Sequence, residues 1–395
     1  MEELLLGLPR EEYERRGAFY TAKEIEQQPE LLRKLADELE EQEKSICQFM
    51  EAVMAIDNLR IILTGAGSSA FVGEAMANLL AGEGVAFPEN IHTTDIVGTP
   101  DMTLRDCPTL LISYARSGES PESQAAIEFA RKRIGNLYQV VIVCGRESTL
   151  ARTGAASDQA LVLVMPEGSN DRGFAMTSSV SCMAAATWCL FHFRDLKAYT
   201  HKVRLLADAA ERNMMSFQQS AGRIAGEDYR RLIFLGLGAL RGLAREGAVK
   251  SMELTNGYVH AGYDTPTGFR HGPKTVLDDT AMTVHFVSPD SYSAQYDTDF
   301  IREMIGEQKK NKIVTVKRSQ DQDSSTAGDF EVLYELPQEL RDEEMGAYLM
   351  GLLFLQLLSL DKSLELGYTS DNPCADGSVN RVVQGVIIHP LPEQV

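Results

Sequence analysis

The chain carries little positive charge for its length. Among 395 residues, Lys and Arg number 38 against 57 Asp and Glu, which gives a formal net charge of −19 at pH 7. Nucleic acids and anionic membrane surfaces repel a chain of this charge. We therefore expect neither nucleic acid nor a membrane as a partner, and any phosphate ligand has to be attracted by a locally positive site.

Long apolar runs and metal-binding motifs are scarce as well. The most apolar segment, 345–360, contains Gln356 and is too short to span a bilayer, so we expect a buried core helix there. The acidic start of the chain lacks the layout of a signal peptide, which predicts a cytoplasmic location. The six cysteines form no C-x-x-C pair and the seven histidines no H-x-x-x-H pair. This pattern predicts reduced thiols and no metal site.

What the sequence does contain is a repeated alternation of apolar strands and helices. In the first half, strands are expected at 61–64, 109–112, 140–144 and 161–164, with an apolar helix over 179–191. The pattern restarts with an apolar run into Gly-x-Gly at 232–238, followed by a helix over 240–256 and strands over 283–287 and 312–316. Near-continuous apolar strands between helices predict two similar α/β halves, each with a parallel sheet covered on both faces.

The N-terminal part differs from both halves and is expected to be a helical arm. Thr21-Ala-Lys-Glu24 has the spacing of a capping box, and leucines at helical spacing follow Pro29. The arm could pack on its own chain or on a partner subunit. The expected organisation is an arm over 1–46, a first domain over 47–205 and a second over 215–385, with the halves joined near 205–228.

The loop after the strand at 109–112 has the layout of a phosphate cradle. It contains Arg116, Ser117 and Ser120 with one glycine, and Pro121 then opens a helix. Proline suits the first helical position and serine the N-cap, so the positive end of the helix faces the loop and favours an anion. Arg116 could add a charge-assisted contact. The alternative is an ordinary loop that caps a helix.

Two further hydroxyl-rich loops each follow a strand and precede a helix. The segment 65–70, Gly-Ala-Gly-Ser-Ser-Ala, matches the dinucleotide-binding fingerprint, or it holds one phosphate through Ser68 and Ser69. Thr177 begins a Thr-Ser-Ser cluster that opens the apolar helix. Because the carboxyl ends of parallel strands share one edge of a sheet, the three loops can converge there. Together they favour a phosphate-bearing ligand over a dinucleotide.

These loops, set in two α/β halves, resemble the sugar isomerase (SIS) domain family. The motifs that carry the resemblance in the first half are Gly-Ala-Gly-Ser-Ser at 65–69, Ser-Gly-Glu-Ser at 117–120 and the cluster at 177–179. In the second half, residues 250–255 and 269–273 resemble catalytic segments of the isomerase half of glucosamine-6-phosphate synthase. The overall layout is most similar to the bacterial tagatose-6-phosphate ketose/aldose isomerase group, also described as galactosamine-6-phosphate deaminase/isomerase. The resemblance implies an α/β fold with two SIS domains, each a doubly wound, flavodoxin-like parallel sheet.

Candidate catalytic residues lie in the second half. Glu246, Lys250 and Glu253 are spaced i, i+4 and i+7 and share a helix face, either as an exposed charge ladder or as a carboxylate base with an ammonium beside it. By resemblance, Glu253 moves a proton between C2 and C1 of the open sugar, and Lys250 stabilises the developing oxyanion. By resemblance again, His271 opens the sugar ring, because imidazole can exchange protons with the ring oxygen and the anomeric hydroxyl. In this family that histidine often reaches a site on the neighbouring subunit.

The resemblance also assigns phosphate-binding positions. They are Ser68 or Ser69, Ser117, Ser120 and Thr177. In one departure, Ala115-Arg116 replaces the Ser-Gln that precedes this motif in the synthase, so one hydroxyl is lost and a cation is gained. Asp371 and Asn372 are either contacts from the C-terminal tail or part of a polar turn.

The expected function is aldose–ketose isomerisation of a hexose or hexosamine 6-phosphate. Galactosamine 6-phosphate would be deaminated through an enolamine and an imine to tagatose 6-phosphate and ammonia. No cofactor is expected, and the resemblance implies a homodimer or homotetramer with a shared active site. The alternatives are isomerisation of tagatose 6-phosphate, or of glucosamine and fructose 6-phosphates, without deamination, and a non-catalytic regulator that binds a sugar phosphate. A dinucleotide-dependent oxidoreductase would rest on residues 65–70 alone.

Overall fold

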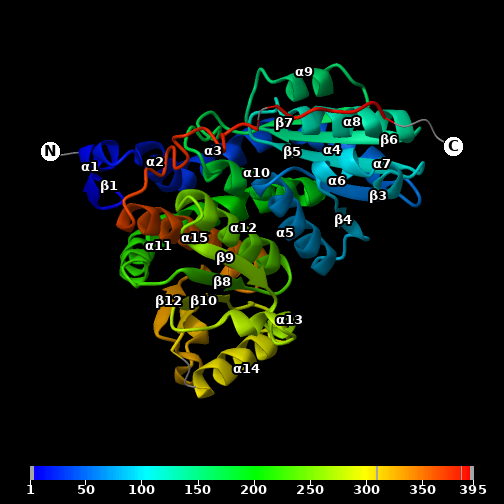
Figure 1. Cartoon of the computed structure of the whole chain (residues 1–395). Coiled ribbons are helices and arrows are strands. Elements are labelled where there is room, and N and C mark those ends of the chain that lie inside the picture. Colours follow the sequence, from blue (N-terminus) through cyan, green and yellow to red (C-terminus); the bar gives the residue numbers. More distant parts are fainter. Residues whose placement is uncertain (1–3, 308–309, 384, 392–395) are drawn as a thin grey trace. The chain divides into compact units, whose positions relative to one another are not determined.

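The computed structural model describes residues 4–307, 310–383 and 385–391 (Figure 1). The chain divides into two compact units, each built around a five-stranded sheet. Among the described residues, the first-sheet unit takes 31–170, 178–203 and those after 378, and the second-sheet unit takes the remainder. Because each unit draws on separate stretches of chain, the domain boundaries expected from the sequence stay a prediction.

The first sheet is parallel throughout, with the strand order β4-β3-β5-β6-β7. Its strands are β3 (Arg60–Thr64), β4 (Pro88–Asn90), β5 (Thr109–Ala115), β6 (Leu137–Val143) and β7 (Ala160–Val164). Counted along the chain, this is the order 2-1-3-4-5 of flavodoxin-like folds, which confirms the predicted fold class for this half. β5 continues past its predicted end at residue 112, because residues 113–115 pair with 141–143 of β6.

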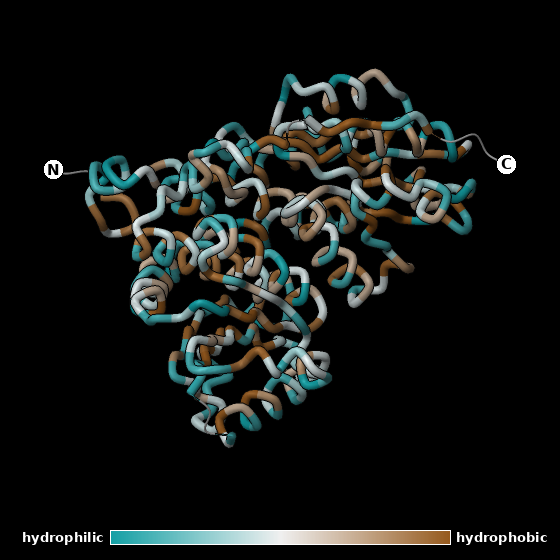
Figure 2. Tube along the Cα trace, in the orientation of Figure 1, coloured by the Kyte–Doolittle hydropathy of each residue, from teal (hydrophilic) through white to brown (hydrophobic). Residues whose placement is uncertain are grey.

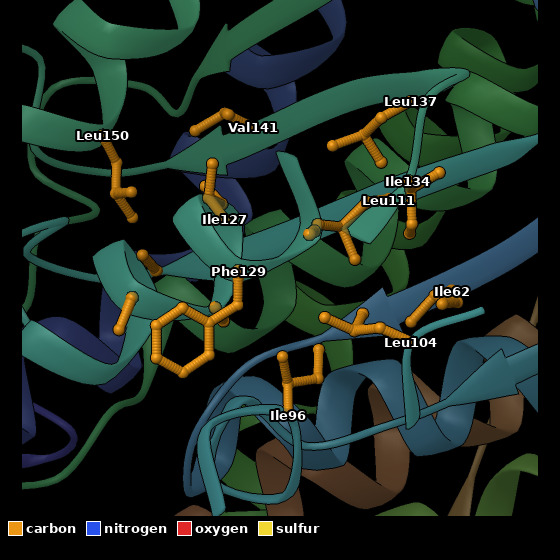
Figure 3. Close-up of a cluster of buried hydrophobic side chains, with 14 of the residues drawn as sticks. Ile62, Ile96, Leu104, Leu111, Ile127, Phe129, Ile134, Leu137, Val141 and Leu150 are labelled. Atoms are coloured by element: carbon orange, nitrogen blue, oxygen red, sulfur yellow. The ribbon is translucent and has the colours of Figure 1, made fainter. Parts of the chain in front are cut away.

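One face of this sheet packs against helices in a single apolar cluster (Figure 3). Ile62, Leu111 and Val141 come from three neighbouring strands, and Ile127 and Phe129 come from the helix after β5. Figure 2 shows the same concentration of hydrophobic residues along these strands. The helices of the unit include α4 (Glu43–Met54), α5 (Ser68–Gly82), α6 (Thr93–Gly98), α7 (Pro100–Thr103), α8 (Pro121–Arg133), α9 (Thr149–Ala155), α10 (Ser178–Phe191) and the short η1 (Phe193–Asp195).

The second sheet repeats the order of the first. Its neighbours run β12-β11-β10-β8-β9, all parallel, which is again 2-1-3-4-5 along the chain. The strands are β8 (Arg231–Leu235), β9 (His260–Asp264), β10 (Ala281–Phe286), β11 (Lys312–Arg318) and β12 (Phe330–Tyr334). The helices between and after them are α12 (Ala239–Leu254), α13 (Pro266–Phe269), η2 (Pro273–Val276), α14 (Ser293–Gly306), η3 (Ser319–Asp321), η4 (Ser324–Thr326), η5 (Gln338–Leu340) and α15 (Glu344–Glu365). The predicted repetition of two similar α/β halves is thereby confirmed.

The helix α15 forms the centre of the second-sheet unit. It is long and apolar enough to cross a membrane, but 94% of its most apolar 18-residue stretch is buried inside the protein, as expected for a core helix. It packs closely on α12, since a Cβ at Gly351 would lie 2.6 Å from a methyl group of Leu243. This close approach fixes the face of α12 that carries Lys250.

The segment expected to join the halves near 205–228 is largely helical, because α11 runs unbroken over Leu196–Ala225. One expectation about the N-terminal arm is wrong. The expected capping box at 21–24 is not a helix start, because α2 (Phe19–Glu26) begins two residues earlier and its N-terminal amides are bonded by a distant carboxylate. The other N-terminal elements are β1 (Leu4–Leu5), β2 (Leu8–Pro9), α1 (Arg10–Arg15) and α3 (Gln28–Glu41).

Candidate active site

The first two hydroxyl-rich loops lie at the same edge of the first sheet. One connects β3 to α5 and the other connects β5 to α8, and these two strands are neighbours in register, with Thr64 opposite Ser113. The strand order reverses between them, because β4 lies on one side of β3 and β5 on the other. In doubly wound sheets, ligands bind outside the carboxyl ends of the strands at such a reversal.

The loop after β3 is shaped by two glycines. A Cβ at Gly65 would lie 2.6 Å from the backbone of Ser69, and Gly67 has a φ of 56°, a conformation that side chains disfavour. The chain therefore turns sharply into α5, with Ser68 and Ser69 in the first turn of the helix. Helix N-termini carry partial positive charge and amides that point outward from the helix end, so this turn suits an anion.

The loop after β5 is held in place by its own polar groups. The Oγ of Ser117 accepts the amide of Glu119 at 3.3 Å and retains its proton for another acceptor. The Glu119 carboxylate accepts the amide and the hydroxyl of Thr149, at 2.8 and 2.9 Å. Ser120 occupies the predicted N-cap position of α8, and its Oγ donates to Glu122 at 2.7 Å. The loop is thus preorganised beside the N-terminus of a second helix.

Arg116 contacts the C-terminal tail. Its guanidinium, which is largely buried, donates to the carbonyl of Arg381 at 2.6 Å. Further along the tail, which is red in Figure 1, Ile388 and Leu391 pack against the apolar cluster of this unit. Arg116 therefore helps to hold the tail on the first-sheet unit, and its contact with a phosphate stays a prediction.

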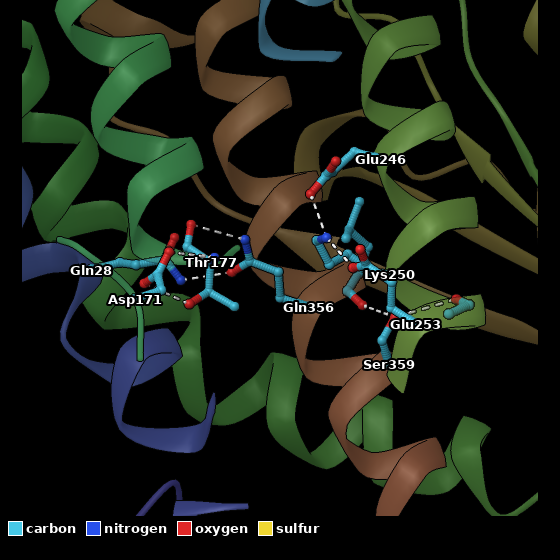
Figure 4. A network of polar contacts seen from close by, with 10 residues as sticks. Gln28, Asp171, Thr177, Glu246, Lys250, Glu253, Gln356 and Ser359 are labelled. Atoms are coloured by element: carbon cyan, nitrogen blue, oxygen red, sulfur yellow. Dashed lines mark hydrogen bonds and ion pairs between the residues drawn. The ribbon is translucent and has the colours of Figure 1, made fainter. Parts of the chain in front are cut away.

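Thr177 is buried in a polar network of the second-sheet unit (Figure 4). Its amide and hydroxyl donate to Asp171 at 2.8 and 3.0 Å, and its carbonyl accepts the amide of Gln356 at 3.3 Å. Gln28 in turn donates to Gln356 at 2.8 Å. The hydroxyl of Thr177 is thus already committed as a donor. Gln356 is the polar residue that interrupts an apolar run, and such an interruption is the sequence signal that could have indicated a buried network.

Carboxylates fasten α2 both to the loop 171–177 and to the segment after α15. Glu24 accepts the amide of Gly173 at 3.1 Å, and Asp371 accepts the amide and the hydroxyl of Thr21, both at 2.8 Å. Asp371 therefore has a structural role in this unit, which favours the polar-turn interpretation of the tail. Burial and the nearby charge of Asp171 raise the pKa of Glu24 to about 8.

This raised pKa predicts a pH-dependent stability. The pKa of Glu24 is about 8 in the folded protein, against an ordinary value of 4.5 in the unfolded chain. Its contribution to stability is therefore complete below about pH 4.5 and is lost as the pH rises through about 8. We expect Glu24→Gln to flatten the decrease of the melting temperature between pH 5 and about 8. Exposed Glu11→Gln is the control and should retain the parent slope. An unchanged slope in Glu24→Gln would contradict the assignment.

At the equivalent helix start beside the second sheet, a carboxyl group of the chain itself lies where an anion would bind. Gly236-Leu-Gly238 follows β8 as Gly65-Ala-Gly67 follows β3, but here Glu344 accepts the amide of Ala239, the first residue of α12, at 2.7 Å. A Cβ at Gly238 would lie 2.4 Å from the same Glu344 oxygen. The helix N-terminus that corresponds to the start of α5 is thus covered by a carboxyl of the chain itself.

The predicted charged face of α12 is present, with Lys250 at its centre (Figure 4). The ammonium lies 3.3 Å from Glu246 and 2.5 Å from Glu253. The side chains of Lys250 and Glu246 are 0% and 1% exposed, whereas that of Glu253 is 31% exposed. The exposed charge ladder is therefore excluded, and Glu253 is the member of the group that a ligand can reach.

Burial changes the role that can be expected of Lys250. Desolvation alone would lower the pKa of its ammonium, but the attraction of Glu246 and Glu253 outweighs it and raises the pKa above its usual value. The ammonium is charged, fully buried and hydrogen-bonded to Glu253. This arrangement indicates that Lys250 holds the Glu253 carboxylate in position. It does not favour the other role expected from the sequence, in which Lys250 contacts the substrate oxyanion directly.

His271 is exposed in the turn between α13 and η2. The hydroxyl of Thr265 accepts the amide of Gly268 at 2.9 Å and so caps α13. Gly272 has a φ of 130°, and Pro273 starts the next helical turn. The turn sequence thus projects the imidazole from the second-sheet unit, as expected.

Two polar residues near the cradle were missed by the sequence analysis. The hydroxyls of Thr64, at the end of β3, and of Ser113, opposite it in β5, are buried and have no hydrogen-bond partner among the residues that the structure describes. A buried hydroxyl without a partner is costly, so both are candidates for ligand contacts. Their signal in the sequence was a polar residue at the end of each apolar strand. Over the same described residues, no three His, Cys, Asp or Glu side chains gather in a way that could hold a metal ion.

Two parallel sheets of order 2-1-3-4-5, with hydroxyl-rich loops at the switch point of one, define a protein with two doubly wound α/β domains, the fold expected of SIS-domain proteins. In agreement, the family model described as SIS domain matches residues 55–193. D-galactosamine-6-phosphate deaminase AgaS of Escherichia coli is 38% identical over 373 residues, which cover 94% of this chain and 96% of the relative. The AgaS protein of Shewanella sp. (strain ANA-3), which bears the same name, is 36% identical over 99% of this chain and 97% of its own. The chain therefore belongs to the AgaS family of SIS-domain proteins.

A solved structure agrees with this assignment. Tagatose-6-phosphate ketose/aldose isomerase from Escherichia coli superimposes with a TM-score of 0.85 at 35% identity, over 94% of this chain and 96% of that one. At this level of similarity the relationship extends over both sheets.

Proposed function

We propose that this protein is a sugar-phosphate isomerase/deaminase that converts D-galactosamine 6-phosphate into tagatose 6-phosphate and ammonia. The observation that carries the proposal is the partly exposed Glu253 carboxylate held by buried Lys250, in a chain whose relatives are named for this deamination. The loops at the switch point of the first sheet support a phosphate-bearing ligand.

The residues divide into two roles. Ser68, Ser69 and Ser117 would bind the phosphate through their hydroxyls, and the loop at Ser120 would bind it through the N-terminus of α8. His271 would open the sugar ring by protonating the ring oxygen and accepting the anomeric proton. The resemblance further supports a homodimer or homotetramer in which His271 serves a neighbouring subunit.

The chemical steps need no more than a base, an acid and water. Glu253 takes the proton from C2 of the open aldehyde while an acid protonates the carbonyl oxygen at C1, which gives an enolamine. Glu253 then returns its proton to C1 while the amine loses one proton, which leaves an imine at C2. Water then adds to the imine carbon, and the C–N bond breaks to release ammonia and a ketone. Lys250 would keep Glu253 in position through both proton transfers.

A panel of hexose and hexosamine 6-phosphates tests the proposal. With D-galactosamine 6-phosphate we expect equal amounts of ammonia and ketose, because hydrolysis of each imine releases one of each. Interconversion of the hydroxy sugars, with no ammonia released from any hexosamine 6-phosphate, would instead support a simple isomerase. Tight binding with no turnover of any sugar would support the non-catalytic regulator. The cytoplasmic location expected from the sequence stays a prediction.

A further inference from the structure

The turn that carries His271 is tied to α14 on both sides of the histidine. One oxygen of Glu303 lies 2.8 Å from the Nε of Arg270, and the other lies 2.5 Å from the Nζ of Lys274. Arg270 directly precedes His271, and Lys274 follows it by three residues. A single carboxylate therefore bonds to both ends of the turn.

The apolar side of the same turn also rests on α14. Phe300, one helical turn before Glu303, is fully buried and meets the ring of Phe269 edge-on at 6.1 Å. The cationic groups of Arg270 and Lys274 lie 5.0 and 5.4 Å from the centre of the Phe300 ring. The turn thus packs on α14 through Phe300 and is bound to the same helix by the ion pairs of Glu303 with Arg270 and Lys274, which we call the clamp.

Lys274 has a second carboxylate partner, which allows its ion pairs to be tested separately from that of Arg270. Glu307, one turn after Glu303, lies 2.5 Å from the Lys274 ammonium. Burial would lower the pKa of Lys274, but its hydrogen bonds to Glu303 and Glu307 raise it, so the ammonium remains charged. Removing Glu307 would weaken one end of the clamp and leave the bond between Glu303 and Arg270.

We propose that Glu303 is a positioning residue for ring opening, which acts by holding the His271 turn through Arg270 and Lys274. This inference rests on the proposed function, in which His271 opens the sugar ring. Ion pairs as exposed as these contribute little to folding stability. By contrast, displacing an acid–base group by ~1 Å can lower the rate by about 10²-fold. The clamp is therefore expected to matter for turnover more than for stability.

A double-mutant cycle on the full-length protein tests the proposal. Glu303→Gln should lower kcat for D-galactosamine 6-phosphate by about 10-fold or more, with KM and melting temperature close to those of the parent. In the His271→Gln background, the same change should leave the residual kcat unaltered, because the group that it positions is already gone. Glu307→Gln is the matched control and should stay within about 2-fold of the parent.

The outcomes separate this proposal from the one on which it rests. A parent-like kcat in Glu303→Gln, with His271→Gln impaired, would overturn the positioning role and leave the proposed function intact. An equal loss in both backgrounds would assign Glu303 a general structural role and also overturn it. Full activity of His271→Gln would overturn the role of His271, and the positioning role with it.

Discussion

Glu253→Gln is expected to lower kcat by about 10²–10⁴-fold, because the amide cannot take the proton from C2. The substitution keeps the shape of the side chain and a hydrogen-bond acceptor for Lys250. Binding of the sugar phosphate should persist, since the proposed phosphate loops belong to the first sheet. Stopped assays of ammonia and ketose give kcat, and calorimetric titration with the substrate gives the affinity.

The control for Glu253→Gln is Glu365→Gln, at the exposed end of α15, which should retain the parent rate. An active Glu253→Gln enzyme would refute the assignment of the base. A variant that loses binding together with turnover would show that Glu253 supports the ligand rather than the reaction.

Lys250→Met should destabilise the protein by about 3–5 kcal/mol, because it leaves the buried Glu246 carboxylate without its ammonium. The effect is large since both side chains are almost completely excluded from water. Urea unfolding at pH 7.5, followed by far-ultraviolet circular dichroism, measures the loss as a lower midpoint.

The double variant Lys250→Met with Glu246→Gln tests the cause of that loss. Removing the charge from the partner should restore a large part of the stability, because the unpaired buried charge is gone. Activity should stay low in both variants, since Glu253 has lost its buried partner. A single variant as stable as the parent would contradict the burial of the pair.

The fold was largely predictable because its signal is local. Apolar strands that lead into Gly-x-Gly and a helix mark a parallel sheet, and the structure has that pattern after β3 and again after β8. The position of Ser120 at the start of α8 follows from Pro121 for the same reason. Charges at helical spacing likewise placed Lys250 beside Glu246 and Glu253.

What could not be predicted depends on contacts between distant parts of the chain. The start of α2 is bonded by Asp371, about 350 residues further on, so the local capping-box pattern was misleading. The burial of Lys250 depends on how closely α15 approaches α12, which no local pattern indicates. The clamp on His271 joins Glu303 to Arg270 and Lys274 across an intervening strand, and its charges look like an ordinary solvated surface in the sequence.

The carboxyl of Glu344 at the start of α12 distinguishes the second half from the first. Two sheets of the same strand order offer two equivalent helix starts that would suit an anion. In the second half the chain supplies its own acidic group there, and this helix start carries an internal imitation of a ligand. Under the proposed function, the first sheet holds the sugar phosphate and the second carries the chemistry. One acidic side chain at a single helix start thus marks the difference in role between two sheets of the same strand order.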